Sequence, residues 1–396
     1  MDSYFPLEEY EERWARAERE MKRRSLAGAV IWGKTAASFA RAGDVLYLVN
    51  YFSGKVGQPF DVSDHRARDY CAVVLRPGQL PELFADDPGF HRSHIPTDRI
   101  RYSPDTVAAV ARSLRAEPIP GRVAFVGSDF FAVKYWDAFM AGTTEIEWEI
   151  CDDLILDLRR RKSSRELECC REAGAIAAAA MDRLMTSLVA GKTEREAAAG
   201  AANEIICRGG VVERINCTFG DKVGATSREP LTGYSASAPE PGDMVKGWLI
   251  GPMFQGYYMD PGRTAVAGGR PDPDQRRLIE TCAEIVMKMA EKTRAGVSFK
   301  AVADVGDRLV TAFGGSADPM AAKHPFFGHP NGLYFEGPPY ISNVVDNMGA
   351  RFQAGDVIGL EAFLTLERVG SAGFEQNYIV HEDGVELITP SPEFLH

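Results

Sequence analysis

Apolar and polar positions in the first part of the chain alternate between helix-like and strand-like patterns. Residues 8–24 are charged, with Tyr10, Trp14 and Met21 as the apolar members, which predicts an amphipathic helix. The residues that follow predict buried strands and one more helix, an alternation typical of an α/β domain up to about residue 155. The expected strands cover 28–31, 45–49, 70–75 and 123–126, and the expected helix covers 129–140.

A long polar segment, residues 51–69, interrupts this first domain. It reads YFSGKVGQPFDVSDHRARD, and a loop of this length inside a compact domain is more often functional than idle. Arg66 and Arg68 lie near its end, and residues two apart in an extended segment point to the same side. Two guanidinium groups there could hold a carboxylate of a ligand. The alternative, which we favour for Arg66 alone, is a solvated basic edge paired with neighbouring aspartates.

The pattern changes near residue 160, where two capping boxes predict long helices. Ser163 is followed by Glu166, and Thr193 is followed by Glu196, the spacing at which two side chains cap a helix start reciprocally. After residue 209 the chain turns to short apolar strands with glycine and proline turns, then to further helices and strands. These helices are expected over 273–294 and 298–313, and the last strands over 357–366 and 374–381. We therefore expect an N-terminal domain, residues 1–157, and a C-terminal domain, residues 158–396.

Composition narrows the classes of protein to which the chain can belong. Apolar residues make up 45% of the 396 residues and charged residues 26%, so a full core is expected and disorder is not. The net charge of −11 argues against nucleic acid as a partner. We see no run of 18 apolar residues and no signal-peptide pattern, so neither a membrane span nor export is expected. The seven scattered cysteines contain no C-x-x-C pair, which favours a reducing cytoplasm.

One carboxylate stands out in the apolar, strand-like segment 244–266. Asp260 lies in the sequence GYYMDPGRT, where a lone buried carboxylate would cost several kcal/mol unless it meets a metal, a cation or a proton. The alternative is an aspartate of an ordinary Asp-Pro-Gly turn.

Three more polar residues occur in similarly apolar surroundings. His329 lies in FFGHPNGLYF, Glu361 in VIGLEAFLTL and Glu375 in AGFEQNYIV. Each one alone is more often a satisfied polar group of a core than a ligand. Together with Asp260 they provide three carboxylates and one imidazole, a donor set suited to Mn, Fe or Zn.

These residues, together with the junction RRRKSSRELECCREAGAIA, resemble the creatinase/aminopeptidase P/prolidase family, peptidase family M24. The resemblance covers nearly the whole chain and implies an α/β creatinase-like N-terminal domain followed by an α+β pita-bread catalytic domain. Family members with two metal ions use two aspartates, one histidine and two glutamates. Asp260 matches the second aspartate, His329 the histidine, and Glu361 and Glu375 the two glutamates. Arg263, which follows Asp260 in the family manner, is expected to be structural.

The chain also departs from the family pattern, and these departures imply a reduced site. Counting eleven positions back from Asp260 places the first aspartate at Leu249, which cannot bind a metal. One catalytic histidine of the peptidases falls near Leu231, with Tyr234 as the closest polar candidate, and the other falls at Glu336. The resemblance therefore implies at most one divalent ion. A metal-free site, as in creatinase itself, is the alternative, and its crowded carboxylates would take up a proton.

The resemblance also suggests how substrate is bound. Arg68 matches an arginine that, in creatinase, reaches the active site of the neighbouring subunit and holds the substrate carboxylate, so we expect a homodimer. Arg66 is a second candidate. Phe327 and Tyr340 are expected to line the pocket, with plain core packing as the alternative for both.

Our leading hypothesis is a cytoplasmic homodimeric hydrolase that cleaves a non-peptide C–N bond in a small nitrogenous metabolite bearing a carboxylate. Asp260, His329, Glu361 and Glu375 would hold one ion or activate water, and Glu336 or Tyr234 would handle protons. The alternatives are an Xaa-Pro dipeptidase with a single metal ion, a lyase on the same fold, and a catalytically inactive binding protein.

Overall fold

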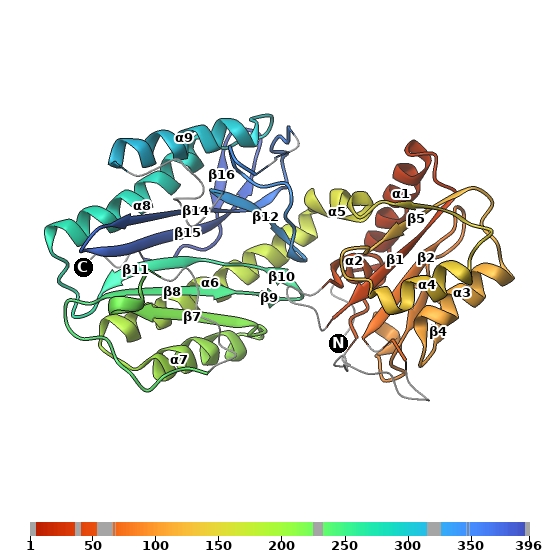
Figure 1. Cartoon of the computed structure of the whole chain (residues 1–396), viewed down its shortest axis with the longest axis horizontal. Coiled ribbons are helices and arrows are strands. Elements are labelled where there is room, and N and C mark those ends of the chain that lie inside the picture. Colours follow the sequence, from red (N-terminus) through yellow and green to blue (C-terminus); the bar gives the residue numbers. More distant parts are fainter. Residues whose placement is uncertain are drawn as a thin grey trace. The chain divides into compact units, whose positions relative to one another are not determined.

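The computed structural model describes residues 5–35, 41–53, 66–67, 69–224, 233–314, 326–345, 347 and 349–392. The chain divides into two compact units, Met1–Arg159 and Arg160–His396 (Figure 1). No helix in the described part of the chain is long and apolar enough to cross a membrane. All seven cysteines lie among the described residues, where none forms a disulfide and only Cys207 is exposed.

The first unit is built on a six-stranded mixed sheet with the strand order β4-β3-β2-β1-β5-β6. Its central strand β1 pairs antiparallel with β2 and parallel with β5, and Trp32 of β1 packs against Phe125, Phe131 and Phe139. The strands are β1 (Gly28–Lys34), β2 (Tyr70–Leu75), β3 (Glu82–Ala85), β4 (Ile100–Tyr102), β5 (Arg122–Val126) and β6 (Glu147–Ile150). The helices are α1 (Leu7–Arg23), α2 (Gly43–Val49), α3 (Thr106–Ala116), α4 (Val133–Ala141) and α5 (Asp153–Arg160), with a short 3-10 turn at Arg92–His94.

The strand predicted over 45–49 is wrong, because these residues belong to helix α2. A short run that is apolar at every position suits a buried strand and a buried helix equally, so its pattern cannot distinguish them. Contacts with α1 favour the helix: Arg13 donates to the carbonyl of Tyr47 and Trp14 to that of Leu48. These two side chains satisfy carbonyl groups at the end of α2, which have no partner within the helix.

The second unit is built on an eight-stranded sheet whose neighbouring strands pair antiparallel. Seven of them follow the order β13-β12-β14-β15-β11-β8-β7, β16 pairs with β15, and β9 and β10 form a separate hairpin. The strands are β7 (Arg214–Phe219), β8 (Met244–Ile250), β9 (Pro252–Phe254), β10 (Tyr257–Tyr258), β11 (Gly262–Val266), β12 (Gly328–Gly332), β13 (Tyr334–Phe335), β14 (Val357–Leu366), β15 (Gly370–Val380) and β16 (Val385–Leu387).

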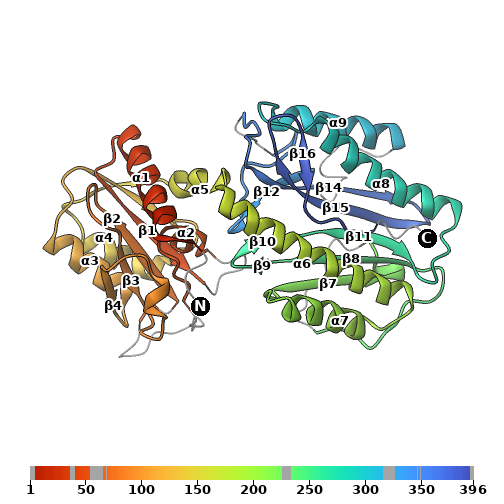
Figure 2. The same cartoon turned by 180° about the vertical axis from the view of Figure 1, so that it is seen from behind.

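Helices cover one face of this sheet. α6 (Ser164–Val189) packs on β8 to β11 and on α7 (Glu194–Cys207), as Figure 2 shows from behind. α8 (Pro273–Lys292) packs on β14, β15 and α9 (Phe299–Phe313). Both predicted capping boxes are confirmed, at Ser163 and Glu166 for α6 and at Thr193 and Glu196 for α7. The second oxygen of Glu166 accepts from Tyr257, which ties the start of α6 to the hairpin before Asp260.

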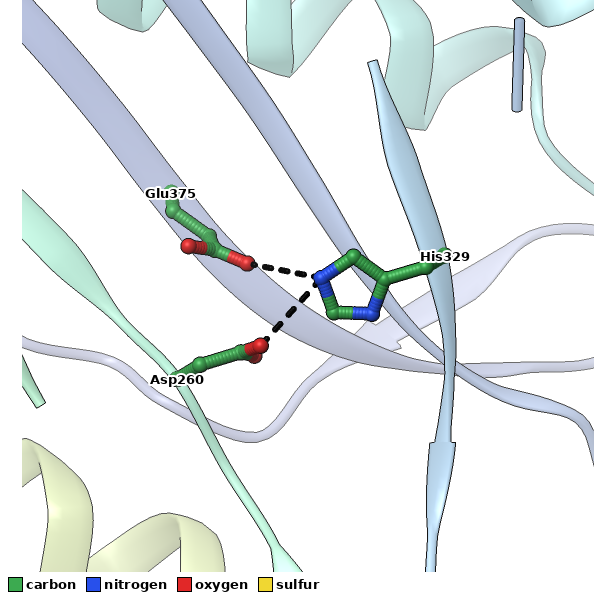
Figure 3. A group of neighbouring side chains, drawn as sticks. All are labelled: Asp260, His329 and Glu375. Carbon is green, nitrogen blue, oxygen red and sulfur yellow. Dashed lines mark ion pairs between the residues drawn. The ribbon is translucent and has the colours of Figure 1, made fainter. Parts of the chain in front are cut away.

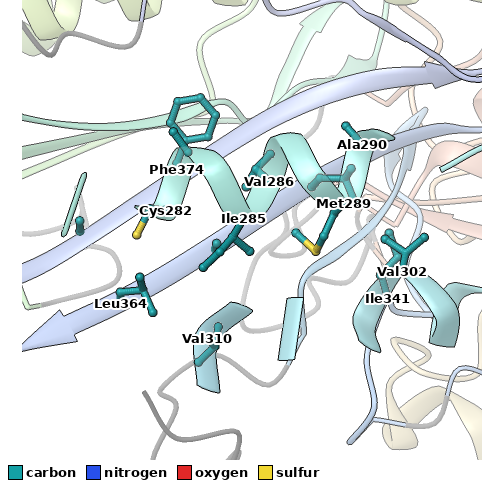
Figure 4. Close-up of a cluster of buried hydrophobic side chains, with 14 of the residues drawn as sticks. Cys282, Ile285, Val286, Met289, Ala290, Val302, Val310, Ile341, Leu364 and Phe374 are labelled. Atoms are coloured by element: carbon teal, nitrogen blue, oxygen red, sulfur yellow. The ribbon is translucent and has the colours of Figure 1, made fainter. Parts of the chain in front are cut away.

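Side chains of β14 alternate between the helix layer and the opposite face. Ile358, Leu360, Ala362 and Leu364 belong to the hydrophobic core under α8, part of which Figure 4 shows. The intervening residues, Gly359 and Glu361 among them, therefore face the other way, since successive side chains of a strand point to opposite sides. This alternation places the polar residues of β14 on the face opposite α8.

Candidate metal centre

Four elements of the second unit bring the predicted ligands together. Asp260 lies between β10 and β11, His329 on β12, Glu361 on β14 and Glu375 on β15. Glu361 and Glu375 are directly opposite in the β14–β15 pairing, and Glu375 is opposite Gly262, two residues after Asp260. Because residues directly opposite one another share a face of the sheet, both glutamates point to the same side.

One ring nitrogen of His329 faces the carboxylates of this group, and Figure 3 shows it opposite Asp260 and Glu375. Its Nε2 lies 3.2 Å from Oδ2 of Asp260, 3.7 Å from Oε1 of Glu375 and 3.9 Å from Oε1 of Glu361. All four residues are buried. Asp260, His329 and Glu375 form the tightest set, with one ligand atom from each within 4.8 Å of the others.

Two asparagines hold Asp260 and His329 in place. Asn331 and Asn377 donate to Oδ1 of Asp260 at 2.8 and 2.6 Å, and Oδ1 of Asn331 lies 2.9 Å from Nδ1 of His329. With the Nδ1 proton donated to Asn331, the Nε2 atom is the one presented to the carboxylates. The sequence analysis missed both asparagines. The available signal was their spacing, since each follows a predicted ligand by two residues on a strand and so shares its face.

The charges of the cluster shift its pKa values in opposite directions. Burial by itself lowers the pKa of His329, but the negative charge of Asp260, its hydrogen bond and the charge of Glu361 outweigh burial and raise it to about 9. For Asp260, burial opposes ionisation, yet His329 and the two asparagines hold the pKa below its usual value. Burial and the charges of Asp260 and Glu361 raise the pKa of Glu375 well above the ordinary value.

This donor set fits a divalent metal ion. Two carboxylates and a neutral imidazole are ligands that Mn, Fe and Zn accept. Oε1 of Glu375 is buried and receives no hydrogen bond from the described residues, although a buried carboxylate oxygen normally has a partner. A cation among these atoms would supply that partner and would relieve the crowding of negative charge that raises the pKa of Glu375.

The strand register shows on which face of the sheet Leu249 lies, the position inferred for the missing first aspartate. Leu249 shares a face with Gly247, where an added Cβ would meet Leu184 and Met185 of α6, so Leu249 points to the helices. Trp248 is the residue on the face of the cluster, and its indole N–H donates to Oε2 of Glu375.

The two predicted proton-handling residues have other partners. Glu336 accepts from Lys162 at 2.6 Å, and both side chains are completely buried. Tyr234 donates to the carbonyl of Ile215 at 2.7 Å. Neither contact connects these residues to the metal-ligand cluster, and no pattern in the sequence indicates Lys162 as the partner of Glu336.

The predicted substrate-binding residues are only partly described. Arg68 lies outside the described residues, and Arg66 is exposed and pairs through its backbone with Pro104. Phe327 packs against Gly306 of α9, in the hydrophobic core. Its neighbour Phe326 lies 6.0 Å from His329 between ring centroids and stacks on Tyr340 at 4.7 Å, and Phe335 lies nearer to the imidazole, at 4.4 Å.

The chain is similar in sequence and structure to several known peptidases. The sequence profile of metallopeptidase family M24 matches residues 168–382, more than half of the chain. The Xaa-Pro dipeptidase of Pyrococcus horikoshii is 26% identical over 258 residues, which cover 63% of this chain and 68% of that protein. The probable dipeptidase PepE of Mycobacterium bovis is 28% identical over 246 residues, which cover 62% of this chain and 63% of that protein.

Solved structures resemble the chain over nearly its whole length. A prolidase from Pyrococcus horikoshii superposes with a TM-score of 0.77 at 19% identity, covering 97% of this chain and 100% of the other. An Xaa-Pro dipeptidase from Bacillus anthracis superposes with a TM-score of 0.78 at 18% identity, covering 97% of this chain and 98% of the other. The predicted creatinase-like N-terminal domain and pita-bread catalytic domain are thereby confirmed. The family profile, the fold and the buried carboxylate–histidine cluster agree that this chain belongs to metallopeptidase family M24.

Proposed function

We propose that the protein is a metal-dependent hydrolase that cleaves the amide C–N bond of small peptides as an Xaa-Pro dipeptidase with one divalent ion. The observation that carries this proposal is the convergence of Asp260, His329 and Glu375 in a buried cluster of metal-binding character. Relatives named Xaa-Pro dipeptidase support the choice of substrate class. The Xaa-Pro dipeptidase with one metal ion, an alternative among the hypotheses from the sequence, is therefore preferred to the non-peptide hydrolase.

The proposed roles follow from the geometry of the cluster. When bound, a divalent ion supplies polarisation of the scissile carbonyl and acidification of the attacking water. Asp260, His329 and Glu375 would hold the ion, and Asn331 keeps the His329 ring in the required tautomer. Glu361 lies outside this tight set, with Oε1 at 3.9 Å from His329, and we assign to it acceptance of the proton from the attacking water.

A second candidate is hydrolysis of a non-peptide C–N bond in a small carboxylate-bearing metabolite. The chain contains no histidine from residue 95 to residue 323, so a peptidase histidine is missing from the segment where the family resemblance expects it. Glu336, at the other expected histidine position, is engaged by Lys162. Both observations favour chemistry that differs from that of the two-metal peptidases.

The two candidates are separated by supplying Mn²⁺ to metal-free protein and comparing substrates. Xaa-Pro dipeptides, dipeptides without proline, and N-acyl or N-amidino amino acids would be assayed side by side. We expect hydrolysis of Xaa-Pro dipeptides that needs added ion and falls more than about 100-fold in Asp260→Asn, a change that removes a ligand charge. Glu367→Gln, an exposed change next to β14, should leave the rate unchanged.

Two results would decide against the first candidate. Turnover of the acyl or amidino compounds without turnover of any dipeptide would establish the second candidate instead. Dipeptide hydrolysis that persists in Asp260→Asn would mean that the cluster is not the catalytic site.

A further inference from the structure

Trp248 lies in a row of residues that crosses the sheet toward the cluster. It is opposite Gly262 of β11, and Gly262 is in turn opposite Glu375 of β15. Glu375 is opposite Glu361 of β14. Residues opposite one another share a face, so the indole and both glutamates occupy the same side of the sheet.

The indole is held flat against the sheet between two glycines and an aromatic ring. A Cβ at Gly262 would overlap the indole, and a Cβ at Gly373 would lie 2.8 Å from it. Phe363 stacks on the indole with 5.0 Å between ring centroids and 23° between planes. Trp248 is 6% exposed. The space beside Glu375 is therefore filled by a ring that has little room to move.

Neutral N–H donors occupy one oxygen of each carboxylate in the tight cluster. Trp248 donates to Oε2 of Glu375, and Oε1 of Glu375 faces His329. Asn331 and Asn377 donate to Oδ1 of Asp260, and Oδ2 of Asp260 faces His329. A carboxylate that bridges two ions with one oxygen on each ion needs both of its oxygens to be available. Here the atoms that remain available, Oδ2, Oε1 and Nε2, converge on one point.

We propose that the indole of Trp248 occupies the place of a second metal ion and makes this a site for one divalent cation per chain. The ring excludes an ion by volume, and its N–H replaces the positive charge at Oε2 of Glu375 with a neutral donor. The inference rests on the metal binding assumed in the proposed function, and it specifies how many ions that site holds and which residue sets the number.

The number of metal ions bound per chain tests this proposal without any assay of activity. Metal-free wild type, Trp248→Phe and Trp248→Asp would be incubated with excess Mn²⁺ or Zn²⁺, separated from free ion and analysed by mass spectrometry. We expect one ion per chain in the wild type and in Trp248→Phe, which removes the indole N–H but keeps an aromatic ring at this position. In Trp248→Asp, which removes the ring and adds a carboxylate, we expect a rise to two. Phe363→Leu, which keeps the indole, should remain at one.

Fluorescence provides a readout that does not require the aspartate variant to fold. Trp248 is the only tryptophan after residue 148, so Trp248→Phe identifies its emission by difference. Titration with Co²⁺ should quench that emission and reach its limit at one equivalent. Two ions in the wild type, a limit at two equivalents, or a folded Trp248→Asp that still binds one ion would each overturn the proposal. Because none of these measurements uses a substrate, they remain valid if the dipeptidase proposal fails.

Discussion

The two ring nitrogens of His329 have different surroundings, and this difference prepares the residue for metal binding. Nδ1 meets the amide oxygen of Asn331, whereas Nε2 faces carboxylates from three other segments. A hydrogen bond to the ring nitrogen that does not face the metal site fixes the orientation of a metal-binding imidazole. Asn331 also donates to Asp260, so one amide group positions two ligands.

Replacing Asn331 should therefore weaken metal binding. We expect Asn331→Ala to raise the dissociation constant for Mn²⁺ or Zn²⁺ by about 10- to 100-fold, the usual effect of removing such a partner. Competition with a chromophoric chelator measures the constant. Asn343→Ala on the exposed surface is the matched control and should leave it unchanged. An unaltered constant in Asn331→Ala would show that the amide does not position the ligands.

The pKa of His329 predicts how metal affinity depends on pH. With a pKa of about 9, the ring is protonated at pH 7 in the metal-free protein, whereas a ligand imidazole must be neutral. Affinity should therefore rise about tenfold per pH unit for each proton released and level off above about pH 9. The raised pKa of Glu375 adds a second proton at low pH. Calorimetry in buffers of different ionisation enthalpy counts the protons, and a pH-independent affinity would contradict this ionisation.

At this scale the sequence could predict which residues form the cluster but not how they are supported. Asp260, His329, Glu361 and Glu375 stand out because polar side chains are costly in apolar strands. Trp248 does not stand out, because a tryptophan in an apolar strand is indistinguishable from a core residue. The buried amides of Asn331 and Asn377 lack a distinctive motif of their own.

At the scale of elements, the long pairing of β14 with β15 brings the ligands together. Gly359 of β14 lies directly beneath the cluster, where an added Cβ would be 2.7 Å from Oε1 of Glu375 and 3.4 Å from Oδ1 of Asp260. The absence of a side chain at this position is therefore a requirement of the site.

A methyl group at this position should disturb both stability and metal binding. We expect Gly359→Ala to lower the free energy of unfolding by about 1–3 kcal/mol, as overpacking of a filled site does, and to weaken the ion's binding. Gly384→Ala is the control, because its Cβ would meet no atom within 4 Å. Denaturant unfolding and metal titration give the two quantities. Equal behaviour of the two alanine variants would mean that the cluster adjusts freely around Gly359.

Sequence patterns predicted the elements whose ends carry chemical signals, and they also predicted β1, β2 and β5 from hydrophobicity alone but failed at one apolar segment. The capping residues of α6 and α7 define where those helices begin, and the alternation of β14 defines a strand whose bounds match the prediction. The segment at Val45–Val49 is apolar throughout, so its helical form depends on contacts with α1 that a local pattern cannot reveal.

At the scale of the whole molecule, the buried ion pair of Lys162 and Glu336 joins distant parts of the second unit. Lys162 lies just before α6, and Glu336 follows β13, 174 residues later in the chain. Removing one partner of a buried pair leaves a charge without compensation.

Replacing one partner of this pair should destabilise the protein more than replacing both. We expect Lys162→Met to lower the free energy of unfolding by about 3–5 kcal/mol, and Lys162→Met with Glu336→Leu to recover much of that loss. Chemical denaturation of the single and double variants provides the measurement. If Lys162→Met reduced the turnover number of a protein of normal stability, Glu336 would instead have the proton-handling role that its sequence position suggested.

The expected contribution of Arg68 to a neighbouring subunit can be tested by mixing variants. Arg68→Ala should lose the anchor for the substrate carboxylate, and Asp260→Asn should lose a metal ligand. If the arginine acts across a homodimer, random exchange of equal amounts restores about a quarter of wild-type activity, because half of the dimers then contain one intact site. No recovery after verified exchange of subunits would place both residues in the same subunit's site or exclude the arginine from it.

The strict alternation along β14 also limits how this protein can change during evolution. Ten successive pairs join β14 to β15, with core residues on one face and the cluster on the other. Inserting or deleting one residue in either strand would exchange the two faces, moving glutamates under α8 and aliphatic side chains into the metal site. Descendants that keep the site should therefore keep the lengths of these strands, whereas the hairpin at β9 and β10 can gain or lose residues. Lineages would then diverge at the position that Trp248 occupies while retaining Glu361 opposite Glu375.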